Sequence, residues 1–310
     1  MKRVSVIGGG VWGAALARAA AHTGARVALF SKRTFEGALP EHVVQVKSFK
    51  EAASHARLLV LAVPSTVAHT VAHELGDYID GSHYVVHGVR GLAEPELATV
   101  SEVVRKETAA RRVGALGGPV LADELARNLP SVMVVGSRFP DLRNEVHEAF
   151  SSPTLRIYSI EDVTGLEWAS ALMGCLAIAI GYARGLDASP GLVAAFITRS
   201  VHEASRIAEA AGGDPNTLLG LAGFGDLLAA ITQEERPEVL FGIALAKGAS
   251  TEEALKAAKL RVEAATLIPK VAAWAEERSV RAPIFRALAD GVAHTKDART
   301  ILHELMTGPN

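Results

Sequence analysis

The segment that most constrains the fold of this chain is residues 8–13, which have the sequence GGGVWG. They follow a β-branched run at residues 4–7, which is typical of a buried strand, and they open a helical pattern at residues 11–22. A strand, a glycine turn and a helix in this order begin a βαβ unit. In that setting the G-x-G-x-x-G spacing is the fingerprint of a dinucleotide site.

Each glycine of the motif has its own physical reason. Gly8 permits the tight turn after the strand, and Gly10 lets backbone N–H groups approach a pyrophosphate. Gly13 allows the helix to pack close to the sheet, so that the positive end of the helix faces the phosphates. A glycine-rich turn without a ligand is the alternative, but the flanking strand and helix favour dinucleotide binding.

The choice of dinucleotide depends on the end of the second predicted strand, residues 27–30. NAD sites place an Asp or Glu about 20 residues after the motif, where it holds the ribose 2′-hydroxyl. Here the segment is Ser31, Lys32 and Arg33, and the first acid is Glu36. Two cations can neutralise a 2′-phosphate, although basic residues after a strand can also be ordinary surface. We therefore expect NADP(H) to be favoured over NAD(H).

Further β-branched runs alternate with helical patterns through the first half of the chain. The run at 58–63 is continuously apolar and ends at Pro64, as expected of a strand buried on both faces. Ser48 and Glu51 have the spacing of a capping box. Because helical patterns separate the strands, we predict an α/β Rossmann-type domain with a mostly parallel sheet. The other predicted strands are residues 83–89, 112–116, 132–135 and 155–158.

Long alanine-rich segments with helical periodicity dominate the chain from about residue 162. Helix starts are indicated by Asp214-Pro215 and by a capping box at Ser250 and Glu253. We therefore predict a dinucleotide-binding Rossmann domain at residues 1–160 and an all-α helical domain at residues 161–310. The predicted helices of the second domain are residues 166–184, 191–211, 222–231, 252–258, 260–278 and 284–293.

Composition and charge exclude several classes of protein. With 32 Lys+Arg against 34 Asp+Glu the net charge is −2, so we expect neither a nucleic-acid partner nor an anionic membrane. Cys175 is the single cysteine, which excludes an internal disulfide.

Residues 168–183 carry no charge, but spanning a bilayer takes about 20 residues, so a buried helix is expected. Since no signal peptide is evident, we expect a cytoplasmic protein. His69 and His73 lack an evident third ligand, so no metal site is expected.

An ordered series of short motifs extends over nearly the whole chain. Taken together, they resemble the bacterial NAD(P)-dependent glycerol-3-phosphate dehydrogenase family. The resemblance implies a Rossmann domain followed by a helical substrate and dimerisation domain, and reversible conversion of dihydroxyacetone phosphate and glycerol 3-phosphate. It also implies a cytoplasmic homodimer. The motifs are Gly8–Ala17, Leu61–Ser65, Val89–Leu92, Gly117–Pro119, 122–127, Asp162–Glu167, Ile197–Arg199, Gly212–Pro215 and Leu219–Leu227.

The cofactor half of the family pattern is largely kept in this sequence. The resemblance implies that the residues after the first two strands contact the dinucleotide, together with residues in later loops. The positions that it implies are Val11, Trp12, Lys32, Arg33, Arg90, Ala122 and Glu263.

Two lysines of the family pattern are replaced. The catalytic lysine and its following asparagine correspond to Met173 and Gly174, and the second active-site lysine corresponds to Arg90. Methionine has no exchangeable proton, and arginine stays protonated, so neither is an effective general acid. Loss of one positioned proton donor typically lowers the rate by about 10²–10⁴-fold. His87 is the first candidate for a replacement donor, although a hydrogen-bonded histidine at a strand end is the more common case.

The substrate-side motifs are changed as well. A Gly-Pro-Ser turn becomes Gly118-Pro119-Val120, and a phosphate-binding Ser-Arg-Asn becomes Arg236-Pro237-Glu238, where the glutamate adds a negative charge. A shift of one residue keeps Arg236 in the place of the family's arginine. Asp226 matches the family, and with Arg90 it is expected to polarise or position the substrate. The residues expected on the substrate side are Arg90, Gly118, Asp226 and Arg236.

Two hypotheses follow from this pattern. The first is an NADP-preferring oxidoreductase that acts, with low or altered activity, on glycerol 3-phosphate and dihydroxyacetone phosphate or on another small hydroxy or carbonyl compound. The second is a catalytically eroded paralogue that binds the dinucleotide as a sensor or interaction protein.

Overall fold

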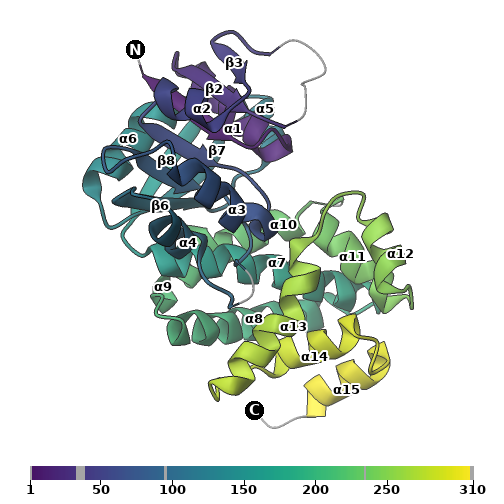
Figure 1. Cartoon of the computed structure of the whole chain (residues 1–310). Coiled ribbons are helices and arrows are strands. Elements are labelled where there is room, and N and C mark those ends of the chain that lie inside the picture. Colours follow the sequence, from purple (N-terminus) through teal and green to yellow (C-terminus); the bar gives the residue numbers. More distant parts are fainter. Residues whose placement is uncertain (1, 33–38, 94–95, 234, 308–310) are drawn as a thin grey trace. The chain divides into compact units, whose positions relative to one another are not determined.

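The computed structural model describes residues 2–32, 39–93, 96–233 and 235–307. The chain divides into two compact units, Met1–Glu167 and Trp168–Asn310 (Figure 1). The boundary falls inside a long helix, α7 (Val163–Gly185), a few residues after the boundary that the sequence patterns place near residue 160.

The first unit contains an eight-stranded sheet with the order β3-β2-β1-β4-β5-β6-β7-β8. Every strand pair is parallel except β6 with β7, so the predicted α/β fold with a mostly parallel sheet is confirmed. The order of strands reverses between β1 and β4, where ligands bind in sheets of this kind. The strands are β1 (Arg3–Ile7), β2 (Arg26–Phe30), β3 (Val43–Val46), β4 (Leu58–Leu61), β5 (Tyr84–His87), β6 (Arg112–Gly117), β7 (Ser131–Gly136) and β8 (Leu155–Ile160).

Helices cover both faces of the sheet, which explains why its strands are apolar throughout. Val4 and Val6 belong to a core shared with one set of helices, whereas Ile7 and Leu59 belong to a second core with the other set. The first set is α1 (Val11–His22), α5 (Ala122–Ala126) and α6 (Pro140–Phe150), and the second is α2 (Phe49–His55), α3 (Ser65–Gly76) and α4 (Val100–Glu107).

Several strand ends differ from the sequence prediction. The strands predicted at 58–63 and 83–89 end at Leu61 and His87, and the residues that follow belong to loops. The edge strand β3 was not predicted, since only the first of its four residues is buried and its apolar pattern is short.

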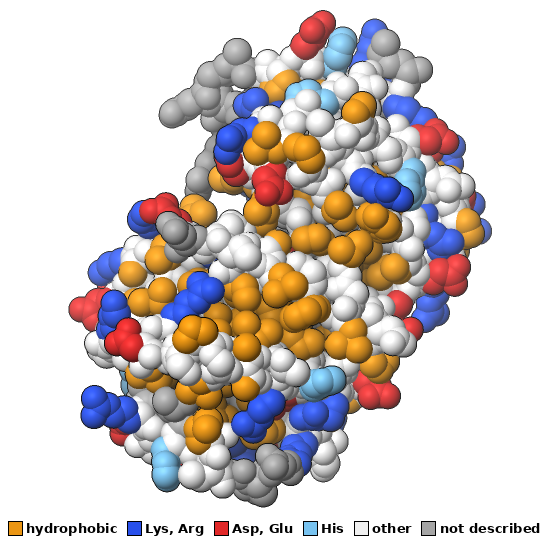
Figure 2. Space-filling model, turned by 180° about the vertical axis from the view of Figure 1, so that it is seen from behind, with side chains coloured by type: hydrophobic (Ala, Val, Ile, Leu, Met, Phe, Trp, Pro, Cys, Tyr) orange, Lys and Arg blue, Asp and Glu red, His pale blue; other side chains and the backbone are white. Residues whose placement is uncertain are grey.

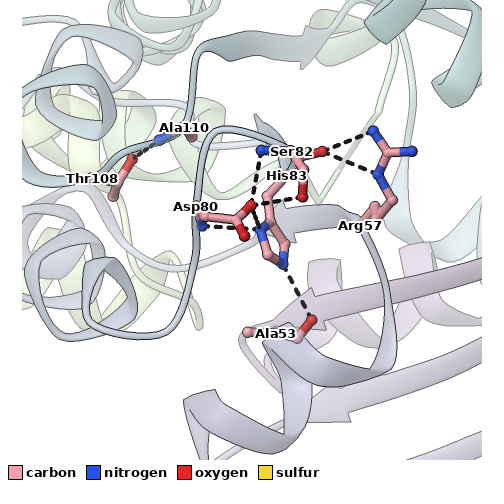
Figure 3. A network of polar contacts seen from close by, with 7 residues as sticks. All are labelled: Ala53, Arg57, Asp80, Ser82, His83, Thr108 and Ala110. Carbon is pink, nitrogen blue, oxygen red and sulfur yellow. Dashed lines mark hydrogen bonds and ion pairs between the residues drawn. The ribbon is translucent and has the colours of Figure 1, made fainter.

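A polar network fixes the amino end of β5 (Figure 3). The carboxylate of Asp80 accepts hydrogen bonds from the backbone N–H and the hydroxyl of Ser82, at 2.8 and 2.6 Å. Arg57 donates to the carbonyl oxygen of Ser82 through Nε and Nη2. The hydrogen bonds from the Ser82 hydroxyl, first, and then from the Ser82 N–H and the His83 ring lower the pKa of the exposed Asp80 to about 2. Because the network lies at the amino ends of the strands, we assign it to stability of the fold.

The second unit is helical, as predicted, and all the regular elements among its described residues are helices. The helix predicted at 222–231 begins as a π-helical turn, because the backbone packs closely there and a Cβ at Gly223 would lie 2.2 Å from the oxygen of Leu218. Two helices, α11 and α15, were not predicted. The elements are α8 (Pro190–Ala210), α9 (Pro215–Leu219), the π-helical turn (Leu221–Gly225), α10 (Asp226–Ile231), α11 (Pro237–Ala246), α12 (Thr251–Ala257), α13 (Glu263–Glu277), α14 (Pro283–Val292) and α15 (Ala298–Thr307).

Helix α7 is the apolar core of the helical unit. Among the described residues it is long and apolar enough to cross a membrane, but 94% of its most apolar window is buried inside the protein. It crosses α11 at glycines, since a Cβ at Gly181 would lie 2.2 Å from the oxygen of Val239 and a Cβ at Gly242 would lie 2.1 Å from the oxygen of Ile178. The burial agrees with the core helix that the sequence predicts.

The surface shown in Figure 2 carries charges of both signs. Apolar side chains gather over the helical unit on this face, and basic and acidic side chains are interspersed around them. On this face, therefore, no large field of one sign accompanies the net charge of −2.

Candidate functional site

Loops that follow β1, β4 and β5 meet at the carboxyl edge of the sheet. Backbone bonds continue the strands into these loops, from Gly8 N to Phe30 O at 2.9 Å, from Ala62 N to Ile7 O at 2.8 Å and from Gly88 N to Leu61 O at 2.8 Å. Parallel strands bring their carboxyl ends to one edge, and this edge includes the point where the strand order reverses. The arrangement therefore creates the place where an α/β sheet binds a ligand.

The turn between β1 and α1 requires glycine at two positions. Gly8 has φ +124°, and a Cβ there would lie 2.2 Å from the carbonyl oxygen of Ala62. A Cβ at Gly13 would lie 1.8 Å from the carbonyl oxygen of Gly8. The first turn of α1 is thus pressed against the loop that precedes it, which is the role predicted for these glycines.

The amino end of α1 is suited to an anion. Gly10 is the N-cap residue and has no side chain to accept the first N–H groups, and a Cβ at this position would meet open space. The first turn of α1 contains no acidic residue, and Val11 within it is 70% exposed. Free N–H groups and the helix dipole both favour negative charge at such an end. The residues present therefore fit the pyrophosphate of a dinucleotide.

The structure brings Trp12 to the loop that carries Arg90. A Cβ at Gly88 would lie 2.4 Å from Nε1 of Trp12, so the indole packs directly on the backbone after β5. Arg90 is half-buried two residues further on. The glycine turn, Trp12 and the Arg90 loop are thus neighbours, although the sequence separates them by almost 80 residues.

His87 belongs to a buried polar network, which favours the more common case of a partnered histidine at a strand end over a replacement proton donor. Its Nε2 lies 2.9 Å from Oε1 of Glu167, and its Nδ1 accepts a hydrogen bond from the N–H of Val89 at 3.3 Å. Glu167 also accepts from the N–H and the hydroxyl of Ser101, at 2.9 and 2.6 Å. Nδ1 is hydrogen-bonded to the backbone of the loop, and Nε2 is buried beside the Glu167 carboxylate, so the ring fixes the start of the Arg90 loop.

The remaining predicted positions of the first unit lie in loops or at element ends. Lys32 is exposed directly after β2, and Arg33 lies outside the described residues. Gly118 has φ +90° in the turn after β6, where a Cβ would lie 2.9 Å from Cγ2 of Val134. Ala122 begins α5 and packs on the core that includes α1.

In the helical unit, Met173 and Gly174 lie on α7, and Met173 is buried. A Cβ at Gly174 would make an ordinary contact of 3.5 Å with Cβ of Ala264. Burial raises the pKa of the neighbouring Cys175 thiol, and the negative charge of Glu238 raises it further. Asp226 is buried as the first residue of α10. The part of α7 around Met173 is therefore apolar, and the carboxylate of Glu238 lies close enough to act on the Cys175 thiol.

Two predicted positions of this unit form ion pairs. Nε of Arg236 lies 2.7 Å from Oε2 of Glu238, and both side chains are 14% exposed. Arg236 is the N-cap residue of α11, and Glu238 lies in the first turn of that helix. Glu263, the first residue of α13, lies 3.6 Å from Nε of Arg261.

Two buried glutamates with long-range partners were not identified from the sequence. Glu167 binds the amino end of α4, as described above, and Glu203 on α8 accepts hydrogen bonds from the N–H groups of Ile284 and Phe285, at 3.1 and 2.8 Å. Burial raises the pKa of Glu203 to about 7. A lone acid on the apolar side of a helix was the available signal, but it does not reveal the partner.

The doubly wound sheet, the glycine turn at its switch point and the helical second unit define a dinucleotide-binding oxidoreductase of two units. A family model described as the N-terminus of NAD-dependent glycerol-3-phosphate dehydrogenase matches residues 31–142, and the corresponding C-terminus model matches residues 162–303. The chain therefore belongs to the NAD-dependent glycerol-3-phosphate dehydrogenase family, as the sequence motifs indicate.

Individual relatives agree with this assignment over the whole chain. A glycerol-3-phosphate dehydrogenase [NAD(P)+] of Fusobacterium nucleatum is 31% identical, with 99% of this chain and 97% of the relative covered. That of Halorhodospira halophila is 32% identical, with 98% and 96% covered. The crystal structure of the Coxiella burnetii glycerol-3-phosphate dehydrogenase superposes with a TM-score of 0.91 at 27% identity, with 99% of each chain covered. These relatives bear dehydrogenase names and lend no support to a non-catalytic sensor.

Proposed function

We propose that this chain transfers hydride between NADP(H) and a small hydroxy or carbonyl compound, glycerol 3-phosphate and dihydroxyacetone phosphate or a changed substrate. The observation that carries the proposal is the uncapped first turn of α1, pressed against Gly8 and open at Gly10. Relatives of the same family are named for NAD(P)+, which supports a dinucleotide of this class. When bound, the dinucleotide supplies the hydride.

Arg90 is proposed to hydrogen-bond the substrate carbonyl and to offset the charge that develops on its oxygen. Its loop is fixed by His87 and packed by Trp12, which supports a positioned guanidinium. A guanidinium donates hydrogen bonds but does not release its proton near neutral pH. Asp226, Gly118 and Arg236 are proposed to orient the substrate, as the family resemblance implies.

Met173 is proposed to stand where the family has its catalytic lysine. A buried thioether cannot donate a proton, so the proton for the carbonyl oxygen would come from water. The proposal predicts turnover about 10²–10⁴-fold below that of an enzyme with a positioned acid. Orientation and hydride delivery remain, so activity is reduced and not abolished.

The test of this function is a pair of measurements. The first is NADPH binding by fluorescence titration, and the second is oxidation of NADPH with dihydroxyacetone phosphate. The double variant Met173→Lys/Gly174→Asn is expected to turn over faster than the wild type, whereas Met173→Leu, the matched control, is expected to match it. Wild-type turnover equal to that of ordinary dehydrogenases would contradict the loss of the proton donor, and failure to bind either dinucleotide would contradict the function.

Preference for NADP(H) is proposed from the basic end of β2. Lys32 is exposed there, and no acid precedes it after the strand. Lys32→Ala is expected to weaken NADPH binding several-fold and to leave NADH binding unchanged. Lys50→Ala, on the exposed side of α2, serves as the control. Equal losses for both dinucleotides would overturn the preference.

Cofactor contacts by Ala122 and Glu263, a cytoplasmic location and a homodimer remain proposals. Figure 2 shows apolar side chains gathered over the helical unit, a feature that often marks a protein interface. Light scattering coupled to size-exclusion chromatography tests the assembly. A mass near twice 32.5 kDa supports the dimer, and a mass near 32.5 kDa rejects it.

A further inference from the structure

One buried carboxylate contacts the chain on both sides of the Arg90 loop. Oε1 of Glu167 lies 2.9 Å from Nε2 of His87, the last residue of β5, and accepts a hydrogen bond from the N–H of Ser101 at 2.9 Å. Its Oε2 accepts from the Ser101 hydroxyl at 2.6 Å. His87 precedes Arg90 by three residues and Ser101 follows it by eleven. The carboxylate therefore joins the two ends of the loop.

The backbone at each end of the loop is held as well. Nδ1 of His87 accepts a hydrogen bond from the N–H of Val89, the residue before Arg90, at 3.3 Å. Ala93 and Ala98 exchange two backbone hydrogen bonds, at 2.8 and 3.0 Å, shortly before α4 begins. The position of Arg90 relative to the sheet thus depends on where these two ends are fixed.

The contacts of Glu167 lie in the core, where their loss has a large effect. The side chains of His87 and Glu167 are 1% and 2% exposed, so water screens their charges little. A carboxylate offers two acceptor oxygens, whereas a glutamine side chain has one and would turn an amide group toward a donor. A buried donor that loses its acceptor is costly. The two ends of the loop should therefore shift when this carboxylate is replaced.

We infer that Glu167 is a positioning residue, which holds both ends of the Arg90 loop so that the guanidinium meets the reacting carbonyl. The inference rests on the proposed function for the role of Arg90, and it adds a residue that does not itself touch the substrate. Glu167 and the residues it contacts belong to the first unit. A displacement of about 1 Å at a group that stabilises the transition state can lower the rate about 100-fold, so a change in the core is expected to reach the chemistry.

The kinetic test compares Glu167→Gln with Glu203→Gln. Glu203 is the matched control, because it is also a buried glutamate whose carboxylate accepts from backbone N–H groups at the start of a helix, here α14. With NADPH and dihydroxyacetone phosphate, kcat is expected to fall about 100-fold in Glu167→Gln and to stay at the wild-type value in Glu203→Gln. The glycine turn is untouched in both variants, so NADPH affinity should remain nearly unchanged.

Ser101→Ala weakens the same contacts with less risk to the fold. It removes the hydroxyl bond to Glu167 and keeps the N–H bond, so a smaller loss of kcat, about tenfold, is expected. Ser200→Ala is its control, because Ser200 is also buried but donates within its own helix to the carbonyl oxygen of Ile197 at 2.9 Å. Circular dichroism shows whether each variant is folded.

A double-mutant cycle with Arg90→Gln separates positioning from a merely structural role. Because Glu167 is inferred to act through Arg90, Glu167→Gln should lower kcat about 100-fold in the wild type but less than about threefold in Arg90→Gln. A residue that only stabilises the fold would give the same loss in both backgrounds. Equal losses, or an unchanged kcat in a folded Glu167→Gln, would overturn the inference.

Hydrogen exchange provides an arm that does not depend on turnover. The N–H of Val89 is expected to exchange at least about tenfold faster in Glu167→Gln and Ser101→Ala than in the wild type, and at the wild-type rate in the two controls. Unchanged exchange in the first two variants would overturn the inference. Failure of the proposed function is a distinct result, since it would appear as absence of NADPH binding and oxidation in the wild type, whereas the exchange rates would still show whether Glu167 holds the loop.

Discussion

The amino ends of α1 and α11 use the same physics to opposite effect. Both are positive helix ends whose first N–H groups lack partners within the helix. At α1 the N-cap is Gly10 and the first turn is free of acids, so the end is open to an anion that a ligand brings. At α11 the N-cap is Arg236 and the first turn contains Glu238, so the end has its own anion. An acid in the first turn therefore makes a helix end less favourable for a second anion.

The largest expected effect on NADPH affinity comes from a change in the close backbone packing at the amino end of α1. Gly13→Ala places a Cβ at 1.8 Å from the carbonyl oxygen of Gly8, so α1 must move away from its loop. We expect NADPH affinity to fall at least about 1,000-fold, or about 4 kcal/mol. Fluorescence titration measures the loss.

Gly191→Ala is the matched control for that substitution. A Cβ at Gly191 meets open space in the first turn of α8, so NADPH affinity should remain unchanged. Tight NADPH binding by Gly13→Ala would show that the ligand does not depend on the packing of α1 against Gly8.

The amino end of α14 receives its acid from another helix, α8. This makes the free energy of unfolding of the protein depend on pH. Glu203 on α8 binds the first N–H groups of α14, and burial raises its pKa from 4.5 to about 7. The folded state therefore holds a proton that the unfolded chain releases. The stabilisation is complete below about pH 4.5 and is lost as the pH rises through about 7.

Glu203→Gln should remove this dependence. Between about pH 5 and pH 8 we expect the free energy of unfolding of the wild type to fall, relative to the variant, by up to about 3 kcal/mol. Urea unfolding at both pH values measures the difference. Parallel pH curves for the two proteins would exclude Glu203 as the titrating group.

An acid placed in the first turn of α1 gives this helix end the feature that distinguishes α11, and so tests whether the difference matters for NADPH binding. Val11→Glu introduces an acid into the first turn of α1 at a position that is 70% exposed, so the fold should tolerate it. Repulsion of the pyrophosphate should weaken NADPH binding about tenfold, or about 1.4 kcal/mol, at low salt. Val11→Gln has the same shape without the charge and should bind normally. Equal binding by the two variants would separate the helix end from the phosphate site.

The smallest expected effect is on the free energy of unfolding, at the amino end of α12, where the cap is formed by residues of the same turn. Ser250 and Glu253 form a capping box at α12, in which the serine hydroxyl accepts from the N–H of Glu253 and the glutamate accepts from the N–H of Ser250. Ser250→Ala should lower the free energy of unfolding by about 1 kcal/mol and leave ligand binding unchanged. Thermal unfolding and NADPH titration check both parts, and a change in binding would contradict a purely local role.

Local chemistry explains how much of this could be predicted from the sequence. The glycine turn and the capping box at Ser250 depend on residues within a few positions of one another, so their patterns are visible in the sequence and the structure confirms them. At Ser48 only half of the predicted box forms: the hydroxyl caps the N–H of Glu51, but the Glu51 carboxylate accepts from the N–H of Lys47. The sheet and the helical second unit were predicted because strand and helix periodicities extend over long segments. The short edge strand β3 has no such extent and was missed.

Long-range pairings could not be predicted in the same way. Glu203 binds residues 81 and 82 positions away, and Glu167 binds a residue 66 positions away. The contact between His87 and Glu167, which the sequence does not reveal, is another such pairing. The negative charge of Glu238 was visible in the sequence, but its pairing with Arg236 depends on side-chain conformations at the start of a helix that was not predicted.

The most direct test of the open helix end is a calorimetric titration of the wild type, Val11→Glu and Val11→Gln with NADPH. We predict one NADPH per chain, bound about tenfold more weakly by Val11→Glu than by the wild type and equally well by Val11→Gln. Equal NADPH binding by all three proteins would show that the amino end of α1 does not hold the phosphates.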